Sequence, residues 1–385
     1  MARLLARGLL PLFAVLSACS APAQPTAVTP KPAPLAPAPA KTEPLPPPVA
    51  VRAAPTRPPP AVLWATTRLR NLDYVSARDV AKQFGFSIAW SKPDIAMTLN
   101  DARGVRFVFE GNQNDCHFDG LRVFLGQPVL RHKDGLWISL LDVIKIVAPL
   151  ARPADHLAQL PASGPHTIVL DPGHGGVDPG KENHRLGLNE KTFTLDVALR
   201  LKKILELRGW RVLLVRTEDR ELSKDKKTDL QMRDEFANRS QADLFLSIHF
   251  NAVEKSPERV TGIETYILPP QFMLTTGFET GDDMTKVAFP GNRFDNGNLL
   301  LGEQLHRAMV GGLRTPDRGY KHARLAVLRL LDCPGALVEC AFLSNDAEAR
   351  RVATPEFRQQ IAESLAAGVQ NYSAAIATLR PVPAP

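Results

Sequence analysis

The chain has few cysteines and few aromatic residues, with 4 Cys among 385 residues and aromatics at 6%. No CxxC pair occurs, which argues against a zinc site built from thiolates. Dense basic tracts are also missing, because the formal charge of +7 is spread along the sequence, and we therefore expect no nucleic-acid binding. A mild attraction to polyanions, such as an anionic cell surface, is consistent with this charge.

The hydrophobic share of 44% is ample for a folded core, so a wholly disordered chain is excluded. Proline is in excess, at 34 residues, and most of the excess lies in the Pro/Ala-rich stretch at residues 19–60. We interpret this stretch as an extended, polyproline-II-like linker that tethers the rest of the chain. A ligand for an SH3-type domain is the alternative.

The N-terminus has the features of an export signal. A basic start precedes the apolar run Leu9–Leu16, which is too short to span a bilayer as a permanent helix. The run ends in LSAC at residues 16–19, which resembles a bacterial lipobox, and that resemblance implies removal of residues 1–18 and acylation of Cys19. Ser20, rather than Asp, after the cysteine suggests sorting to the outer membrane. An ordinary signal peptide cleaved nearby is the alternative.

Three further cysteines are present, namely Cys116, Cys333 and Cys340. An odd number cannot be fully paired within one chain. Cys333 and Cys340 would lie too far apart in an extended segment to form a disulfide. We expect buried free thiols.

Residues 62–150 are predicted to form a small α+β accessory domain of short elements. Residues 76–85 predict a capped helix that starts at Ser76 and stops at Gly85. Alternating strands follow at 105–109 and 121–125.

A second helix is predicted over residues 140–147, and residues 151–165 are a linker. This order of elements resembles the module called copper amine oxidase N-terminal-like. The name implies no copper chemistry here, because His117 and His132 have no second ligand at a useful spacing.

Residues 166–373 alternate strand and helix patterns, which predicts one α/β domain with a mainly parallel sheet flanked by helices. The expected strands are 167–170, 211–215, 244–248, 262–268, 326–331 and 336–342. The expected helices are 188–207, 229–239, 298–313 and 356–372. In such sheets ligands and chemistry gather beyond the carboxyl ends of the strands.

Three polar residues stand where that rule places chemistry, and a fourth lies within a strand. His174 lies in a glycine-rich turn, DPGHGG at residues 171–176, after the first strand, and His249 ends a later strand. Glu190 opens the long first helix. Glu339 interrupts an apolar strand, where a charge is costly unless it is paired or functional.

Each of the four also has an ordinary structural explanation. His174 could be a turn histidine, His249 a core histidine, and Glu190 an acid that complements the helix dipole. Glu339 could form a buried ion pair with an arginine such as Arg318. Together, however, two imidazoles and one carboxylate suit a catalytic zinc with an open fourth position, and a further carboxylate can serve as general base for a water that the zinc activates.

Several segments together resemble the zinc-dependent N-acetylmuramoyl-L-alanine amidases of the Amidase_3 type, over residues 166–373. The resemblance is carried, in family order, by IVLDPGHGG (168–176), Glu190, MR with AN (232–238), SIHFNA (247–252) and LVE with FLSN (337–345). It implies a Zn²⁺ site, and the ligands it implies are His174, Glu190 and His249. It also implies that Glu339 is the catalytic acid/base.

The resemblance further places Asn251 and Arg318 on segments that line the cleft of the family. His184, six residues before Glu190, is a rival ligand, and we rank it lower because Glu190 occupies the matching helix start. Asp171 can orient an imidazole from behind or hydrogen-bond within its own loop.

The implied reaction is hydrolysis of the amide between N-acetylmuramic acid and L-alanine of the stem peptide in peptidoglycan. The enzyme would act in the periplasm, lipid-anchored at the outer membrane. A non-catalytic wall-binding protein with this fold, or a zinc hydrolase of another amide, are the alternatives. No feature identifies an activator protein.

Regulated relatives in this family carry an occluding helix in a region that corresponds to residues 268–298. In this chain glycine and proline interrupt any long helical pattern there. We expect a substrate loop or lid in its place.

Overall fold

The computed structural model describes residues 63–93, 95–133, 135–159, 166–278 and 284–379. These residues belong to one compact unit of the chain. The predicted signal peptide, Cys19 and the linker at 19–60 lie outside the described residues. Among the residues described, no helix has the length and apolar character needed to cross a membrane.

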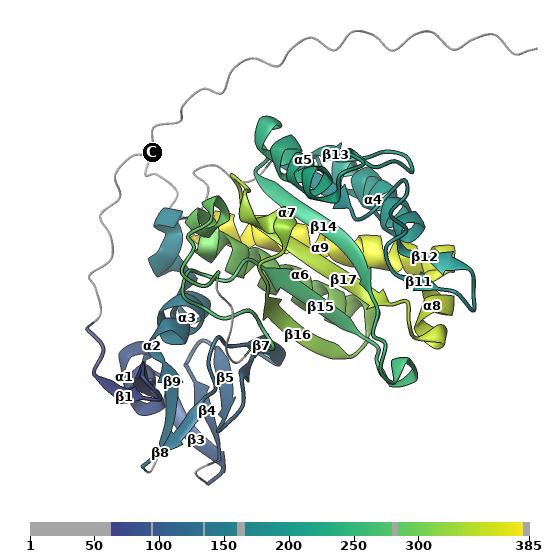
Figure 1. The fold of residues 1–385 in the computed structure, drawn as a ribbon. Helices are drawn as coiled ribbons and strands as arrows, with labels where there is room; N and C mark the ends of the chain where they lie inside the picture. The colour runs from purple at the N-terminus through teal and green to yellow at the C-terminus, as the bar shows by residue number, and fades with distance from the viewer. Residues whose placement is uncertain (1–62, 94, 134, 160–165, 279–283, 380–385) are drawn as a thin grey trace, which may run out of the picture. The chain divides into compact units, whose positions relative to one another are not determined.

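The N-terminal region, residues 63–151, holds two sets of strands and short helices (Figure 1). Its strands are β1 (Thr66–Leu69), β2 (Leu72–Ser76), β3 (Ser87–Lys92), β4 (Ala96–Asn100), β5 (Arg106–Glu110), β6 (Asp115–Phe118), β7 (Leu121–Phe124), β8 (Leu130–His132) and β9 (Gly135–Ser139). Its helices are α1 (Ala77–Phe84), α2 (Leu140–Asp142) and α3 (Ala148–Ala151), the last two joined by a π-helical turn at Val143–Val147.

The capped helix predicted in this region is confirmed. Ser76 accepts a hydrogen bond from the Arg78 backbone N–H, and Gly85 closes α1 with a left-handed φ of 70°. The strands predicted at 105–109 and 121–125 are confirmed within one residue at their ends. The likeness to the copper amine oxidase N-terminal-like module stays a prediction.

The C-terminal region, residues 166–379, follows a 3-10 helix at Pro153–Gln159. Its strands are β10 (Thr167–Pro172), β11 (Glu182–Asn183), β12 (Leu188–Asn189), β13 (Arg211–Leu214), β14 (Leu244–Asn251), β15 (Ile263–Ile267), β16 (Asp317–His322) and β17 (Gly335–Phe342). Its helices are α4 (Glu190–Leu207), α5 (Lys226–Arg239), α6 (Asp295–Leu313), α7 (Ala326–Arg329), α8 (Asp346–Val352) and α9 (Pro355–Leu379), with short 3-10 turns at Pro257–Arg259 and Pro290–Phe294.

A single mixed sheet runs through both regions, in the order β13-β10-β14-β17-β15-β16-β7-β6-β5-β4-β3. The four strands β13, β10, β14 and β17 are mutually parallel, as predicted. β15 runs antiparallel to β17, and β16 runs parallel to β15. The α/β fold class is thereby confirmed, with two strands reversed at one side of the parallel group.

Alternating side chains divide the C-terminal region into two packed layers. On one face of the sheet, Ile168, Leu246 and Val338 belong to the core that α4, α6 and α9 cover. In the view of Figure 1, α6 and α9 pass behind the sheet. On the other face, Phe245 and Leu337 pack in a smaller core beneath α5 and α7.

The strand predicted at residues 326–331 is wrong, because Ala326–Arg329 forms the short helix α7. A run of four to six apolar residues fits either structure, and here Val327 and Leu328 pack into the smaller core against α5. The strand β16 was not predicted, since its sequence, DRGYKH, has no apolar alternation. The three free thiols are confirmed as buried.

The segment expected to form a lid begins at the end of β15. Because β15 is antiparallel to β17, it leaves the sheet at the end opposite to the strand carboxyl ends. The Met273 side chain is buried against Gly126 of the N-terminal region, and the Met273 carbonyl accepts a 2.6 Å hydrogen bond from Arg324. Between β15 and the turn at Pro290–Phe294 the described residues form no helix. Met273 thus contacts both the N-terminal region and Arg324 of the C-terminal region, whereas a lid over the strand carboxyl ends would begin at the other end of the sheet.

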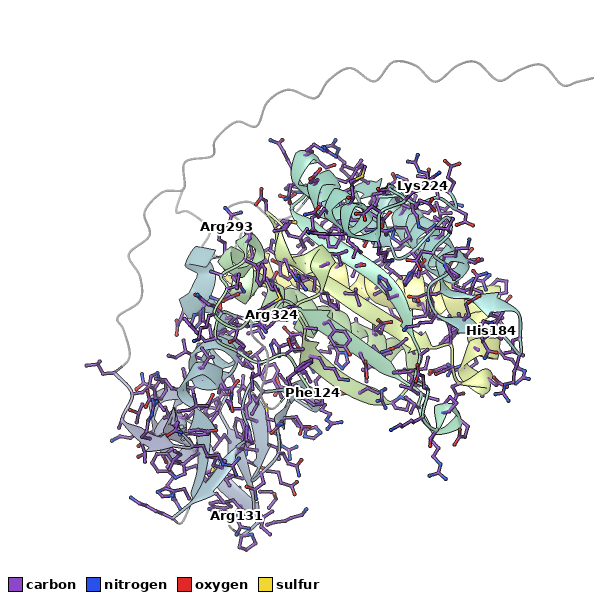
Figure 2. The ribbon with its side chains drawn as sticks, in the orientation of Figure 1. Phe124, Arg131, His184, Lys224, Arg293 and Arg324 are labelled. Carbon is purple, nitrogen blue, oxygen red and sulfur yellow. The ribbon has the colours of Figure 1, made fainter. Side chains whose placement is uncertain are left out.

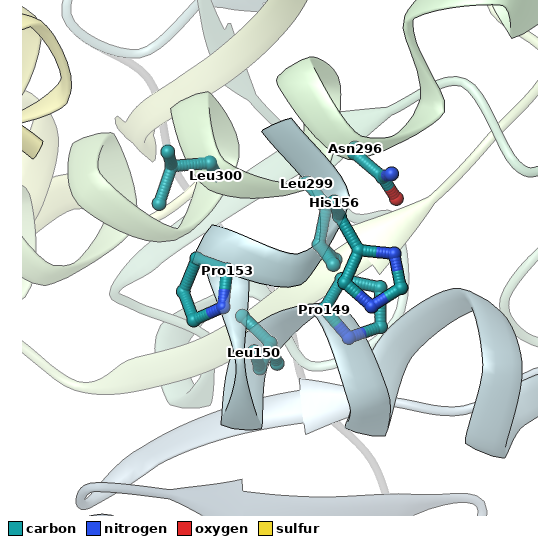
Figure 3. A pocket seen from close by; sticks show the side chains of 7 residues that line it. All are labelled: Pro149, Leu150, Pro153, His156, Asn296, Leu299 and Leu300. Atoms are coloured by element: carbon teal, nitrogen blue, oxygen red, sulfur yellow. The ribbon is translucent and has the colours of Figure 1, made fainter. Parts of the chain in front are cut away.

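The two regions also meet at β7 and β16, which pair in parallel where Val123 faces Tyr320. The Arg122 backbone N–H donates to Asp317 Oδ2 at 2.8 Å. A small pocket at another part of the junction is shown in Figure 3. It is lined by Pro149, Leu150, Pro153, His156, Asn296, Leu299 and Leu300. Backbone pairing and apolar packing together make the junction continuous.

Asp234, on α5, is a buried carboxyl group with 1% of its surface exposed. Its Oδ1 has no hydrogen-bond partner among the described residues. Burial, and then the negative charge of Asp171, raise the pKa of Asp234 to about 8. The folded protein therefore keeps a proton on this group at neutral pH, although the unfolded chain ionises it.

We expect the substitution Asp234→Asn to stabilise the fold selectively at high pH. Because the folded pKa is raised, the stability that the protonated group contributes is lost as the pH rises through about 8. The gain in free energy of unfolding should therefore grow between pH 5 and pH 9 by a few kcal/mol, at ~1.36 kcal/mol per pKa unit. Urea denaturation at both pH values measures it, with the exposed Glu235→Gln as control. A gain independent of pH would contradict this assignment.

Candidate active site

Three predicted residues converge at the carboxyl end of the parallel strands. His174 follows β10, Glu190 begins α4 and His249 lies near the end of β14. One ligand atom from each lies within 4.8 Å of those of the other two. The His174 and His249 rings are 4.9 Å apart between centroids and nearly perpendicular, at 77°. The fold thus brings together residues separated by up to 75 positions in the sequence.

Glu190 is the centre of this cluster, and only 1% of it is exposed. Its Oε2 lies 3.0 Å from His174 Nε2, and its Oε1 lies 2.8 Å from His249 Nδ1. The backbone N–H groups of Lys181 and Phe250 donate to the two oxygens at 2.7 and 2.9 Å. Burial alone would raise the pKa of Glu190, but the hydrogen bonds and charges of the two imidazoles outweigh it and hold that pKa well below its usual value. The buried carboxylate therefore stays ionised.

His174 is held in a strained backbone conformation, with a φ of 64° that is uncommon for a residue with a side chain. Its Nδ1 lies 2.8 Å from Asp178 Oδ2, and its Nε2 lies 3.0 Å from Glu190 Oε2. A ring that donates its Nδ1–H to Asp178 would present the lone pair of Nε2 to a metal ion at the cluster. At the neighbouring Gly173, a side-chain carbon would overlap the His249 ring, so only glycine permits this close approach.

Two buried arginines fix the loop that carries His174. Arg233 donates to Asp171 Oδ1 at 2.7 Å, to Asp229 at 2.8 Å and to the His174 carbonyl at 3.0 Å. Arg216 donates to the carbonyls of Pro172 and Gly173, each at 3.0 Å. The described contacts of the Asp171 carboxylate match neither of the two roles considered for it, because it binds Arg233 of α5 and accepts a hydrogen bond from the Ser247 hydroxyl of β14.

Glu339 lies beside the cluster on the neighbouring strand. In the sheet register Glu339 faces His249 on one side and Glu264 on the other, so all three side chains point to the same face. The Oε2 of Glu339 is buried, with no hydrogen-bond partner among the described residues. Burial, and then the negative charges of Glu190 and Glu264, raise the pKa of Glu339 well above its usual value.

The remaining predicted residues lie at different places. Arg318 and Asn251 both bind Glu264, at 3.0 and 2.9 Å, and hold it next to Glu339. The ion pair considered between Arg318 and Glu339 does not form within the described part of the chain. His184, the rival ligand, is exposed at the turn between β11 and β12, where Figure 2 labels it, and among the described residues it is not part of the group whose ligand atoms converge.

Sequence reasoning missed two residues of the site, Asp178 and Glu264. Asp178 lies four positions after His174 in the same loop, but no local pattern specifies how an irregular loop folds back on itself. Glu264 lies in a strand whose partner was not predicted, so its cross-strand contact with Lys321, at 2.6 Å, was not visible. The pairing of β15 with β16 was needed to find it.

The chemistry of the cluster suits a divalent metal ion. Two imidazole nitrogens and one ionised carboxylate converge from three elements, and an additional carboxyl group lies beside them with an unpartnered oxygen. Nitrogen and oxygen donors in this combination fit zinc at catalytic sites, where a fourth position stays open.

Comparison with known proteins matches the region that carries this cluster to a family. A family model described as N-acetylmuramoyl-L-alanine amidase matches residues 168–371. AmiC of Neisseria meningitidis is 35% identical over 231 residues, which cover 53% of this chain and 52% of AmiC. The germination-specific amidase of Bacillus subtilis is 30% identical over 221 residues, which cover 55% of this chain and 81% of that protein.

Among solved structures, the N-acetylmuramoyl-L-alanine amidase from Clostridium difficile 630 aligns with a TM-score of 0.43 at 30% identity, over 55% of this chain and 97% of that one. The chain spans about half the length of the meningococcal relative, at 52%. The family match covers more than half of the chain and contains His174, Glu190, His249 and Glu339. This chain belongs to the N-acetylmuramoyl-L-alanine amidase family.

Proposed function

We propose that this protein hydrolyses the amide bond between N-acetylmuramic acid and L-alanine of the stem peptide in peptidoglycan. Membership of the amidase family supports this reaction. The single observation that carries the proposal is the convergence of His174, Glu190 and His249 beside Glu339. A protein that only bound the cell wall would have no need for an unpartnered buried carboxyl group next to three metal-binding side chains.

We assign the three converging residues as ligands of Zn²⁺. When bound, the ion would supply Lewis-acid polarisation of the scissile carbonyl and lower the pKa of a water molecule. Asp178 keeps the His174 ring in the orientation in which Nε2 faces the cluster. The Arg216 and Arg233 contacts hold the loop backbone, so the ligands keep their positions between turnovers.

Glu339 is the proposed general acid/base. Its Oε2 takes a proton from the attacking water and delivers a proton to the departing amine of L-alanine. The carboxyl pKa raised by burial and by Glu190 and Glu264 makes the protonated form accessible for the second step. A Zn²⁺ ion bound at the neighbouring cluster would favour the ionised form of Glu339, which the first step requires. Asn251 and Arg318 act as cleft residues that position Glu264 beside it.

We also propose that the protein is exported and anchored by a lipid on Cys19, in the periplasm at the outer membrane. The LSAC motif at residues 16–19 supports this location. The proline-rich residues 19–60 would then separate the enzyme from its anchor by on the order of 100 Å, at ~3.1 Å per residue.

Digestion of purified peptidoglycan tests the reaction. We expect stem peptides with a new N-terminal L-alanine, detected by amine labelling and mass spectrometry. Chelation should abolish their release, and added zinc should restore it. Disaccharide-peptides, which come from glycan cleavage, would contradict the amidase assignment, and binding without products would favour a wall-binding protein.

The ligand assignment predicts different metal contents for two histidine variants. His174→Ala removes a converging donor and should reduce bound zinc, measured by atomic emission after dialysis, to well below one ion per chain. The control His184→Ala removes an exposed histidine of the same loop region and should retain one ion per chain. Equal loss in both variants would count against the assignment.

The role of Glu339 predicts a separation of metal binding from turnover. Glu339→Gln keeps the shape of the side chain but cannot accept the proton, so zinc content should be unchanged while kcat falls about 10²–10⁴-fold. Glu182→Gln, at an exposed position of β11, is the matched control and should behave as wild type. Loss of zinc from Glu339→Gln would make Glu339 a ligand and would overturn its assigned role.

A further inference from the structure

The sheet face that carries Glu339 continues beyond the cluster towards the N-terminal region. Glu264 lies next to Glu339 across the strands, and its Oε1 accepts hydrogen bonds from Arg318 at 3.0 Å and from Lys321 at 2.6 Å. Both cations belong to β16, the last strand of the C-terminal region in this sheet. Basic side chains therefore follow the two carboxyl groups along one face.

The first aromatic residue beyond β16 comes from the N-terminal region. Phe124 of β7 has the Lys321 ammonium 5.4 Å from its ring centroid, and the Arg122 guanidinium 4.7 Å from the same centroid. A side-chain carbon at Gly319 of β16 would overlap the Phe124 ring, and the φ of 105° at this position also requires glycine. The ring thus lies directly over β16, and Figure 2 labels it at the junction. The two regions are therefore in contact at Phe124 and β16.

Three cations lie on this face beyond Glu339, and each is bound to a carboxylate. Arg122 pairs with Asp115, and Glu264 accepts hydrogen bonds from Arg318 and Lys321. The arginine side chains are 40% and 34% exposed. Each guanidinium has five N–H donors, and in the described contacts only the Nε of each forms a hydrogen bond. Their terminal N–H groups can therefore receive a ligand carboxylate in bidentate geometry.

We propose that Arg122 and Phe124 of the N-terminal region complete the substrate groove and bind the carboxylate-bearing part of the stem peptide. This inference rests on the proposed amidase function. Three strand intervals separate β17 from β7, which is about 14 Å at ~4.8 Å per interval. An extended tetrapeptide has about the same length, at ~3.5 Å per residue. A stem peptide cut at Glu339 therefore reaches Arg122 with its distal free carboxylates.

The same sheet face continues past Arg122 within the N-terminal region. Val108 and His117 are paired in register with Arg122 and lie on the same face. With Arg106 and Gly120 they line a shallow pocket. Residues of the N-terminal region thus determine which peptide is accepted, while the chemistry stays with the C-terminal region.

Kinetics on two soluble substrates test the inference. One is a muramoyl tetrapeptide with free carboxylates, and the other is the same compound with its carboxylates amidated. In the full chain, Arg122→Ala should raise KM for the acidic substrate about tenfold, because one charge-assisted hydrogen bond is lost. The KM for the amidated substrate should rise far less. Arg78→Ala, an exposed arginine on α1 of the same region, is the matched control and should not change either value.

The outcomes separate this inference from the proposed function. If the wild type cleaves neither substrate, the amidase assignment fails. If it cleaves both and Arg122→Ala matches the wild type on both, or loses equally on both, the carboxylate site is refuted while the amidase stands. Should Arg122→Ala melt at a lower temperature, Arg122→Lys replaces it, because it keeps the charge towards Asp115 but not the planar fork. A KM increase limited to the acidic substrate supports the site, and no increase overturns it.

Discussion

The buried carboxylate of Glu190 is the constraint on which the site depends. An ionised group with 1% exposure is costly unless hydrogen bonds and opposite charge compensate for its lost hydration. Here two imidazoles and two backbone N–H groups surround it, and they come from β14, from the loop after β10 and from the segment before α4. The same arrangement that makes the carboxylate tolerable inside the protein also gathers the donors that a metal ion needs.

That arrangement requires a rigid loop, and the rigidity comes from beneath the site. Arg216 and Arg233 are almost completely buried and direct their N–H groups at the carbonyls of the loop that precedes and includes His174. Loop carbonyls have no strand partner, so these arginines replace the hydrogen bonds that a sheet would supply. Asp171 neutralises one of them. The strained φ of His174 persists because the hydrogen bonds from Arg216 and Arg233 hold the loop backbone in this conformation.

The N-terminal region covers the edge of the sheet at β16. Without it, β16 would be an open edge with unpaired backbone groups. The strand β7 takes that place, and β6, β5, β4 and β3 continue the sheet. Phe124 then lies over Gly319, so the surface beside the strands that carry His249 and Glu339 is built from both regions. An added domain that served only as a tether would not need this continuity.

The sequence by itself determined the elements with strong local signals and the types of residue in the site. Burial periodicity and helix capping are local patterns, and they predicted the apolar strands β10, β14 and β17 and the capped helix α1. Polar residues in or near these elements indicated the candidate residues His174, Glu190, His249 and Glu339. The same patterns failed at Ala326–Arg329, where a short apolar run fits both helix and strand.

Only the tertiary structure decided how these parts meet. Chain reversal in the loop brings Asp178 next to His174. Strand pairing between distant segments sets the direction of β15 and places Glu339 between His249 and Glu264. Likewise, nothing in the sequence of β7 indicates that it would lie against β16, about 195 residues further along the chain. Contacts at such separations depend on the packing of the whole sheet, which no local pattern encodes.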